Sequence, residues 1–400
     1  MGLPSYNEAL ELACSIVHQI ESFECVPLGC SIGRVLASDI HSDRDLPPYN
    51  RSQMDGYAVH ASEIHQGVSL EVVTRIAAGS SSSVATKPNQ CVAIATGAPV
   101  PPQFDAVVQH ELTDRGDLTG KKVTFHVDNV RVGNAIHKRG VDATEGASVI
   151  PARTILASHH IGIAATVGTT DCTVVQRPSV ILLTSGDEVV GQQETPEDHQ
   201  IRNGNGPMLC SLFESFGCEV LRHVHVQDDP TSTNKAIDQA LQDCELLVTV
   251  GGISAGERDF FPRAFEQSGV DCVVKGAAIQ PGKPVMVGRK NETIVLGLPG
   301  NPVSALACAH VFGRPIVQTM LGVQQAMQWI ELPLAEAVLP NQHRTAFRPC
   351  TIVDGSILIP SWQGSGDLVH TSTTIGLAQL PMMDAKIPAG THVPFLRFSR

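Results

Sequence analysis

The sequence predicts a multidomain protein of α/β plus β class. In this prediction, a domain with a doubly wound, mostly parallel sheet lies between a β-rich lobe and a small C-terminal β domain. The length of 400 residues exceeds what one hydrophobic core usually holds. After Arg177–Pro178, apolar strands alternate with helices, which is typical of βαβ units. Before and after that stretch, short strand-like runs are broken by Pro, Gly and Ser, which favours β structure.

The first part of the chain predicts one helix followed by short strands. Ser5 and Glu8 have the spacing of a capping box, and apolar residues recur on one stripe, so we expect an amphipathic helix over 5–22. Beyond residue 46, the runs SLEVVTRI, CVAIAT and DAVVQ predict short strands. These runs indicate a β-rich lobe.

The central part of the chain predicts five strands and four helices. The strands are SVILLT (179–184), CEVLRHVHV (218–226), CELLVTV (244–250), DCVV (271–274) and TIVLGL (293–298). The helices are expected at about 203–216, 231–243, 258–268 and 302–320. Past about residue 330, runs such as FRPCTIVDGSILIPSW and THVPFLRF predict a small all-β terminal domain.

These patterns divide the chain into three parts. We expect an N-terminal region over 1–176, an α/β domain over 177–325 and a C-terminal domain over 326–400. Within the first region, helical or linker parts at 1–45 and 141–176 should flank the β-rich lobe at about 46–140.

Charge and composition exclude some classes of partner. The formal net charge of −12 argues against nucleic-acid binding, which depends on clustered Lys and Arg, but it leaves room for a small anionic ligand. Neither a signal peptide nor an apolar run long enough to span a bilayer is evident, so we expect a soluble, cytoplasmic protein. Eleven scattered cysteines are expected to stay reduced. The pairs His159–His160 and His223 with His225 have no Cys or His partner at zinc-site spacing, so we expect them to be structural.

The loops that follow the predicted strands carry the chemistry. In a doubly wound sheet the ligand lies beyond the C-terminal ends of the strands, near helix N-termini. Here those loops read TSGDE (184–188), VGGISAGERD (250–259) and GLPGNP (297–302). Their glycines allow backbone N–H groups to approach an oxyanion, with hydroxyl or amide groups beside them. The residues expected to bind ligand are Ser185, Gly186, Asp187, Gly251, Gly252, Ser254, Pro299, Gly300 and Asn301.

Acidic residues converge on the same strand ends. Asp187, Glu188 and Asp259 lie in these loops, and Asp228 follows the second strand. Carboxylates beside phosphates repel them unless a divalent cation lies between, and Mg²⁺ prefers a few carboxylates plus phosphate oxygens. We therefore expect Asp187, Glu188, Asp228 and Asp259 to hold Mg²⁺. Each loop alone could be an ordinary tight turn, but their recurrence along one sheet favours a binding site.

One lysine near these loops is a further candidate. Lys283 follows a Pro-Gly turn in QPGKPVMVG, where its ammonium group could contact phosphate or remain a solvated loop side chain. A P-loop motif is absent, and no strand is followed by G-x-G-x-x-G, which disfavours P-loop and dinucleotide-binding folds.

Six segments together resemble a known family. YNRSQMDGYAV, ATGAPVP, TSGDEVV, VGGISAGERDF, QPGKPV and GLPGNPVSA are similar to signature segments of the molybdopterin molybdenumtransferases, the family of bacterial MoeA and the gephyrin E domain. They occur in the family's order and cover nearly the whole chain. The resemblance implies an elongated homodimer with a C-terminal β-barrel. It also implies a reaction in which adenylylated molybdopterin and molybdate give molybdenum cofactor and AMP, assisted by Mg²⁺.

The resemblance also implies roles for particular residues. The active site is expected between the α/β domain of one subunit and the β-rich lobe of its partner, with Asp55 and Thr96 contributed by the partner. Lys275 and Lys283 fall in ligand-binding segments. The implied catalytic residues are Asp55, Thr96, Glu188, Asp228 and Asp259. Upstream cofactor-synthesis enzymes and apo-molybdoenzymes are the implied protein partners.

Departures from the family pattern leave a second function open. Gln280 replaces the basic residue before the Pro-Gly-Lys turn, and His137 stands where the family tends to have arginine. A pterin-binding scaffold or carrier of the same fold, without turnover, is therefore the alternative to an active transferase. The acidic set favours the enzyme, because a binder of an anionic ligand gains nothing from surrounding it with carboxylates.

Overall fold

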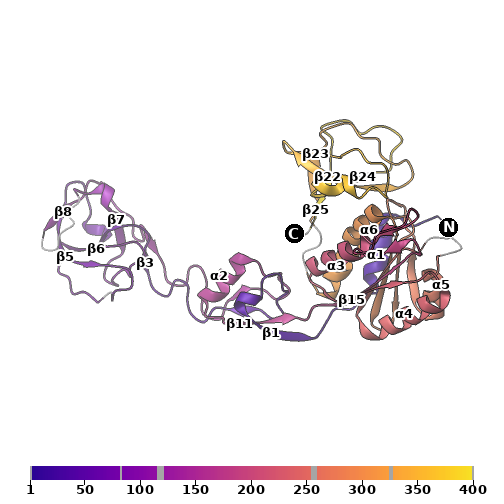
Figure 1. Cartoon of the computed structure of the whole chain (residues 1–400). Helices are drawn as coiled ribbons and strands as arrows, with labels where there is room; N and C mark the ends of the chain where they lie inside the picture. The colour runs from indigo at the N-terminus through magenta and orange to yellow at the C-terminus, as the bar shows by residue number, and fades with distance from the viewer. Residues whose placement is uncertain (1, 82, 115–120, 254–258, 324–327, 399–400) are drawn as a thin grey trace.

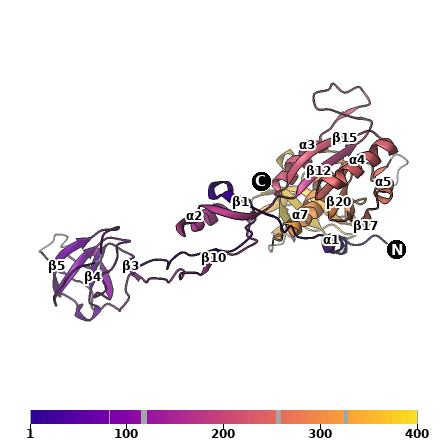
Figure 2. The same cartoon turned by 90° about the horizontal axis from the view of Figure 1, so that it is seen from below.

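The computed structural model describes residues 2–81, 83–114, 121–253, 259–323 and 328–398. The protein is elongated (Figures 1 and 2). A β lobe lies at one end, a short middle region follows, and the α/β and C-terminal parts lie together at the other end. Within the described ranges, no helix is long and apolar enough to cross a membrane.

The lobe at the far end is built on a five-stranded sheet with the order β7-β4-β6-β5-β8. Its strands are β4 (Gly56–Val59), β5 (Ser69–Ile76), β6 (Gln90–Ile94), β7 (Ala106–Gln109) and β8 (Lys122–Thr124), with short 3-10 helices η2 (Ala61–Glu63) and η3 (His110–Leu112). Alternate residues face two separate cores: Tyr57 packs with Phe125 on one face, and Ala58 packs with Phe104 on the other. The expected runs 69–76 and 106–109 are confirmed as strands.

The middle region joins this lobe to the rest of the chain. It contains β1 (Phe23–Pro27), η1 (Leu28–Cys30), β2 (Ile40–His41), β3 (Arg51–Ser52), β9 (Ile136–His137), β10 (Ser148–Ile150), α2 (Ser158–Thr166) and β11 (Asp171–Val175). The antiparallel pairs are β1 with β11, β2 with β10 and β3 with β9. A small core around Leu36, Ile150 and Val174 holds it together. The chain thus runs out to the lobe and back along two adjacent strands.

A six-stranded sheet with the order β15-β12-β16-β20-β19-β17 forms the α/β unit. Its strands are β12 (Ser179–Ser185), β15 (Glu219–Val226), β16 (Leu246–Val250), β17 (Asp271–Lys275), β19 (Met286–Lys290) and β20 (Thr293–Leu298). The first four strands of that order pair in parallel, whereas β19 and β17 pair antiparallel. The five strands expected from the sequence are confirmed, and β19 is an additional one. The short pair β13 (Val189–Val190) and β14 (Ile201–Arg202) extends beside the unit.

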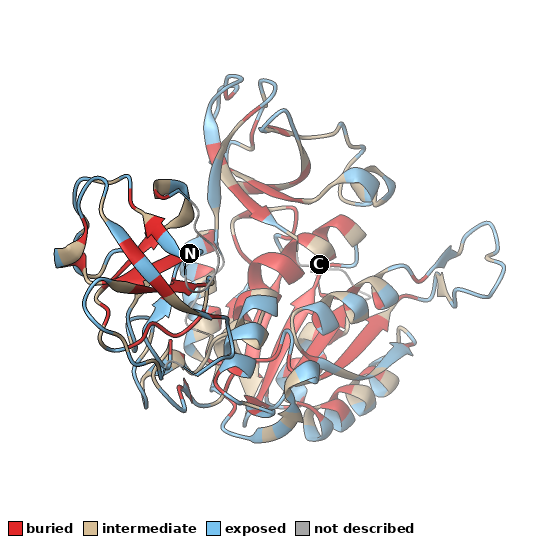
Figure 3. Ribbon diagram, turned by 90° about the vertical axis from the view of Figure 1, so that its left-hand side faces the viewer, coloured by how far each residue is buried: buried red, intermediate tan, exposed pale blue. Residues whose placement is uncertain are grey.

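Helices cover both faces of this sheet, and Figure 3 shows the strands buried between them. Along β12, Leu182 enters one core with helix α3 (Asn205–Ser215), whereas Leu183 enters the other with α4 (Pro230–Asp243) and α5 (Phe261–Gln267). The first face also carries α1 (Tyr6–Ser15), α6 (Pro302–Cys308), a π-helical turn η4 (Ala309–Gly313) and α7 (Arg314–Met320). Burial on both faces explains why these strands are continuous apolar runs rather than alternating ones.

The C-terminal domain is a second six-stranded sheet. It contains β18 (Ile279–Gln280), β21 (Ile330–Pro333), β22 (Thr345–Val353), β23 (Ser356–Leu358), β24 (Gly376–Leu380) and β25 (His392–Arg397), with η5 (Val369–Thr373) in a connecting loop. The order is β18-β22-β24-β25-β21, and β23 pairs with β22. Strand β18 comes from the α/β segment, so the two domains share backbone hydrogen bonds.

Two helices differ from the sequence expectation. The first helix begins with the expected capping box at Ser5 but ends at Ser15 rather than 22, with Ile16 as its C-cap. The chain then turns toward α7, where the Ile20 N–H donates to the Met320 carbonyl, and this tertiary bond replaces a further helical turn. The expected helix over 302–320 is divided by the π-helical turn η4.

Candidate active site

A cleft of about 1090 Å³ lies at the C-terminal ends of β12, β16 and β20. One wall is formed by the loops that follow these strands. The opposite wall is formed by the turn at 280–284, by Arg344 and by the C-terminal segment 362–368. Parallel strands direct their C-terminal ends to one edge of a sheet, so three loops that are distant in sequence meet here.

Glycines allow the loops to come close together. Gly251 has a φ of +90°, and a Cβ atom there would lie 3.1 Å from the Ser185 carbonyl oxygen. A Cβ atom on Gly300 would lie 3.3 Å from the Cα atom of Gly251. Side chains at these positions would push the β12, β16 and β20 loops apart, so the glycines set the shape of the cleft floor.

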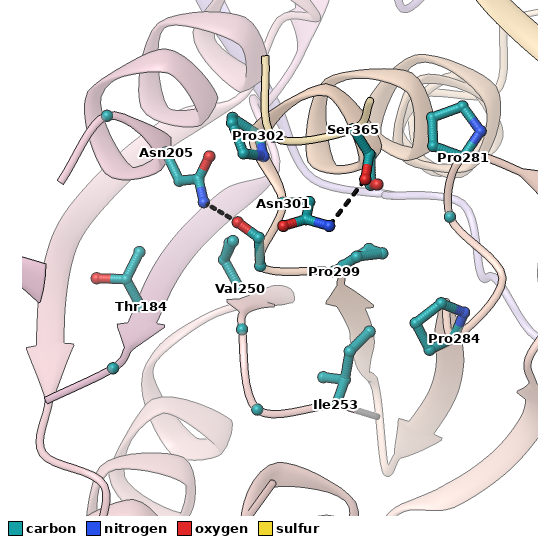
Figure 4. Close-up of a pocket in the computed structure, with 18 of the residues that line it drawn as sticks. Thr184, Asn205, Val250, Ile253, Pro281, Pro284, Pro299, Asn301, Pro302 and Ser365 are labelled. Carbon is teal, nitrogen blue, oxygen red and sulfur yellow. Dashed lines mark hydrogen bonds between the residues drawn. The ribbon is translucent and has the colours of Figure 1, made fainter. Parts of the chain in front are cut away.

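Two amide side chains fix the loop after β20 (Figure 4). Asn205, at the start of α3, donates to the Gly300 carbonyl at 2.7 Å. Asn301 donates to the Ser365 hydroxyl at 2.8 Å, and the Val303 N–H donates to the Ser365 carbonyl at 3.0 Å. These bonds join the GLPGNP loop to α3 on one side and to the C-terminal domain on the other.

Acidic side chains form part of the cleft lining. Glu188, Asp228 and Asp259 line it, and Asp187 lies beside it. The Asp187 N–H donates to the Asp228 carboxylate at 3.3 Å, and the Asp228 N–H donates to the Asp187 carboxylate at 3.2 Å. Burial raises the pKa of Asp228, and repulsion from Asp187 and Glu188 raises it further. The carboxylates are therefore held together against their mutual repulsion.

Cationic side chains line the cleft as well. They are Arg202, Lys283 and Arg344. Gln280 also lines the cleft, and its side-chain oxygen accepts from Asn341 at 3.0 Å. Arg344 precedes Thr345, which pairs with Ile279, so Arg344 and the uncharged Gln280 lie on neighbouring strands at the cleft. Cations and carboxylates in one cleft suit a phosphorylated ligand bridged by a metal ion.

The structure brings together most of the residues expected from the sequence. The expected residues that line the cleft are Ser185, Gly186, Glu188, Asp228, Gly251, Gly252, Asp259, Lys283, Pro299, Gly300 and Asn301. Lys275 does not line it, because it lies on the exposed edge strand β17, paired with Met286. Ser254 lies outside the described residues.

Asp55 and Thr96 lie in the lobe at the opposite end of the molecule (Figure 1). The Thr96 N–H and hydroxyl both donate to the same Asp55 carboxylate oxygen, at 2.7 and 3.2 Å. The backbone N–H is the main cause of the lowered pKa of Asp55, and the hydroxyl adds to it. Both side chains are exposed. The pair therefore presents an ordered carboxylate to solvent, far from the cleft of its own chain.

Several lining residues were not predicted from the sequence. Arg202, Asn205, Arg344, Trp362 and Ser365 enter the cleft from an extended pair, a helix start and the C-terminal domain. Their positions depend on how the domains pack together, which no local pattern encodes. The QGSG segment at 363–366 was the one available signal, because glycines around a serine suit a close approach to the GLPGNP loop.

A hydrogen-bonded group lies directly behind the β12 loop. The Thr184 hydroxyl contacts His223 Nε2 at 2.9 Å and His225 Nδ1 at 3.1 Å, and it accepts from Asn203 at 3.0 Å. His225 Nε2 lies 3.1 Å from the Gly186 carbonyl oxygen. A carbonyl only accepts, so His225 Nε2 carries the proton and fixes the position of Gly186. Burial, followed by repulsion from His225, lowers the pKa of His223.

The carboxylates fit Mg²⁺ only if substrate phosphates and water supply its remaining ligands. No three His, Cys, Asp or Glu side chains of the described ranges form a ready-made metal cluster. Mg²⁺ usually takes one or two carboxylates together with substrate phosphates and water, however, rather than an all-protein cage. Glu188 and Asp228 both line the cleft, so carboxylates of this number are present there.

Comparison with known proteins defines the class of the chain. Residues 4–168 match the family model of the MoeA N-terminal region, domains I and II. Residues 181–319 match the model of a probable molybdopterin binding domain, and this stretch contains the three strand-end loops. The chain is thus a multidomain protein built around a molybdopterin-binding type of α/β domain.

Relatives of full length identify the family. The chain is 32% identical over 402 residues to a molybdopterin molybdenumtransferase of Synechococcus elongatus, covering 97% of this chain and 98% of that one. It is 32% identical over 320 residues to that of Bacillus subtilis, covering 79% and 74%. A crystal structure of a molybdopterin biosynthesis MoeA protein from Pyrococcus horikoshii superposes with a TM-score of 0.77 at 26% identity, covering 99% of both chains. The chain belongs to the molybdopterin molybdenumtransferase family.

Proposed function

We propose that this chain is an active molybdopterin molybdenumtransferase, which transfers molybdenum from molybdate to adenylylated molybdopterin and releases AMP. The observation that carries the proposal is the cleft, where carboxylates, cations and glycine turns from three strand ends face one another. This combination matches a ligand with a phosphoanhydride bond and an oxyanion. The chain's relatives from Synechococcus elongatus and Bacillus subtilis, both molybdopterin molybdenumtransferases, support the same activity.

The residues divide into those that bind charge and those that orient the reaction. Lys283 and Arg344 would neutralise phosphate oxygens, each well-placed contact being worth about 1.5–3 kcal/mol. The backbone N–H of Gly252 would approach the same oxygens, whereas that of Gly251 donates to the Leu298 carbonyl. The arginine at 344 offers the positive charge that Gln280 does not, which answers the main departure from the family pattern.

We propose that Glu188 and Asp228 would hold Mg²⁺, with Asp187 and Asp259 in support. The ion would supply charge neutralisation between carboxylates and phosphates. Burial and neighbouring carboxylates raise the pKa of Asp228, so it accepts a proton more readily than an exposed aspartate does. We assign to it the orientation of the oxygen nucleophile that cleaves the phosphoanhydride.

We propose that the working form is a homodimer in which the lobe of one chain completes the cleft of the other. The exposed Asp55–Thr96 pair is ordered but distant from its own cleft, which supports a role across a subunit interface. Mixing Asp55→Asn with Asp259→Asn chains tests this directly. Each variant alone should be inactive. In a mixed dimer one of the two sites carries both native residues, so the mixture should regain about one quarter of the activity with random pairing, and about one half if every dimer is mixed. An inactive mixture, with subunit exchange demonstrated, would contradict the shared site.

The proposed activity is tested by AMP release. Purified protein given adenylylated molybdopterin, molybdate and Mg²⁺ should release AMP and form a cofactor that activates an apo-molybdoenzyme. Asp259→Asn should abolish release, and the exposed His343→Asn serves as a control outside the cleft. Ligand binding without AMP release from the native chain would instead indicate a scaffold or carrier.

The finer architecture is proposed on the same basis. The parallel strand order β15-β12-β16-β20, with helices on both faces, supports a doubly wound sheet. Bridges between Leu334 and Ile357 and between Val338 and Ile387 support closure of the C-terminal sheet into a barrel. We propose that the N-terminal region ends at residue 176 and that the α/β domain ends at residue 325. Eleven cysteines without disulfides fit a reducing, cytoplasmic setting.

A further inference from the structure

One aromatic side chain faces the cleft. Among the described lining residues, Trp362 is the only aromatic one, and it is half-buried. The other lining side chains are carboxylates, cations, amides, hydroxyls and small apolar groups. An indole in such surroundings has no apolar core to join, so its position calls for a different explanation.

The indole is held by a half-buried cation behind it. The Arg348 guanidinium carbon lies 4.0 Å from the centroid of the Trp362 ring, which is close contact over the ring face. Arg348 lies on β22, and its Nη1 atom is buried without a hydrogen-bond partner in the described part of the chain. The His370 ring lies 5.9 Å away at 52° and borders the indole on another side. These contacts fix the ring plane before any ligand arrives.

Trp362 belongs to the C-terminal segment that lines the cleft. It precedes by three residues Ser365, whose hydroxyl accepts from Asn301 in the loop after β20. The ring thus stands on the wall formed by the C-terminal segment, which is joined to the GLPGNP loop that suits phosphate. A ligand whose phosphates occupy the glycine turns could extend a flat group toward this wall. Both the adenine and the pterin of the proposed substrate are flat, fused nitrogen heterocycles.

We propose that Trp362, backed by Arg348, is a stacking platform for a fused heteroaromatic ring of the ligand, and so a specificity-determining residue of this cleft. The inference rests on the proposed function for the identity of the ligand. Stacking of a base on an aromatic side chain contributes enough binding energy to change affinity by about 5- to 100-fold. The platform distinguishes ligands with a ring from those with phosphate alone.

Calorimetric titration of the full-length chain with AMP, ribose 5-phosphate and 6-carboxypterin tests the proposal. Trp362→Ala should weaken AMP about 5- to 100-fold, while ribose 5-phosphate, which keeps the phosphate but lacks the ring, should change less than twofold. Trp362→Phe should retain most of the affinity for AMP. A weakened 6-carboxypterin with unchanged AMP would assign the platform to the pterin, and the reverse result would assign it to the adenine.

Fluorescence gives a second readout, because the chain has only two tryptophans, Trp329 and Trp362. In Trp329→Phe, the remaining Trp362 emission should be quenched by AMP but not by ribose 5-phosphate. In Trp362→Phe, the Trp329 emission should be unchanged by AMP, and it also reports whether the fold is intact.

Equal weakening of AMP and ribose 5-phosphate by Trp362→Ala, or no weakening of any ring-bearing probe, would overturn the platform. Neither result would affect AMP release by the native chain, so the platform can fail while the proposed function stands. Conversely, a native chain that releases no AMP but shows ring-dependent quenching would remove the transferase and keep the platform.

Discussion

Protonation of one buried histidine should make the stability of the α/β unit depend on pH. His310 lies in the π-helical turn η4 with 1% of its surface exposed, stacked on Phe398 with ring centroids 4.5 Å apart. Its Nδ1 atom is buried without a hydrogen-bond partner within the described ranges. Burial, together with the smaller effect of the nearby Arg314 charge, lowers the pKa of His310 from 6.5 to about 3. The folded chain therefore keeps this ring neutral.

The sign and size of the effect follow from linkage. Above pH 6.5 the ring is neutral in both states and costs nothing, whereas below pH 6.5 the unfolded chain gains a proton that the folded chain cannot take. The free energy of unfolding should thus fall as pH drops from 6.5 toward 3. With these two pKa values, the loss between pH 7.5 and pH 5.0 is about 2 kcal/mol.

Urea unfolding followed by tryptophan emission, at several pH values between 7.5 and 5.0, measures this loss. His310→Leu should lower stability at pH 7.5. Between pH 7.5 and pH 5.0, however, the free energy of unfolding of this variant should fall by about 2 kcal/mol less than that of the native chain. His343→Leu, at an exposed position, controls for the removal of one histidine. Parallel pH profiles for the native chain and His310→Leu would refute the reasoning, whatever the stability at pH 7.5.

Three further changes are predicted at the cleft. Burial and neighbouring carboxylates raise the pKa of Asp228, so its charge is unfavourable in the folded chain. Asp228→Asn should therefore raise the melting temperature at pH 7.5 while abolishing AMP release. An unchanged or lower melting temperature would contradict repulsion among these carboxylates. Gly206→Ala would place a Cβ atom 2.2 Å from His223 Cε1, so it should lower the free energy of unfolding in urea by about 1–3 kcal/mol. Adding His223→Ala to the same chain should recover part of that loss. Arg344→Ala should weaken calorimetric binding of AMP about tenfold in low salt, with a smaller effect at 0.5 M salt, and equal losses at both salt levels would argue against a charge-based contact.

Much of the sheet could be predicted because its strands carry strong local signals. Strands β12, β16 and β20 are apolar runs followed directly by Gly or Pro, and burial on both faces leaves no competing pattern. The loops at their ends could then be placed together by the rule for parallel strands, without knowing the packing. This is why Glu188, Asp228 and Asp259 were brought to one cleft by sequence reasoning.

The rest of the site depends on tertiary packing that local patterns do not carry. Arg344 and Trp362 reach the cleft because β18 pairs with β22 across the two domains. Likewise, α1 ends at Ser15 because the following residues bond to α7 rather than to the helix. Lys275 shows the opposite case: it ends β17 at the edge of the sheet, two strands away from β20, and it is exposed and does not line the cleft.

The histidines of β15 illustrate a third limit. His223 and His225 were expected to be structural because they lack metal spacing, and their contacts with Thr184 and Gly186 agree with that expectation. Residues two apart on a strand share a face, which the sequence shows, but the partner on that face comes from β12. Residue spacing alone therefore could not predict that these histidines contact the loop after β12.

The path of the chain through the middle region has a consequence for cleavage and transplantation. The polypeptide passes outward near residues 40–52 and returns near 136–150, with a bridge between Leu46 and Ala143 and a bond from Arg139 to Asp45. A protease that nicks one pass leaves the distal lobe attached through the other, so its release needs two cuts. Because the lobe has cores of its own and its two ends lie side by side, it is a module that could be excised and spliced into another hairpin as an intact folding unit.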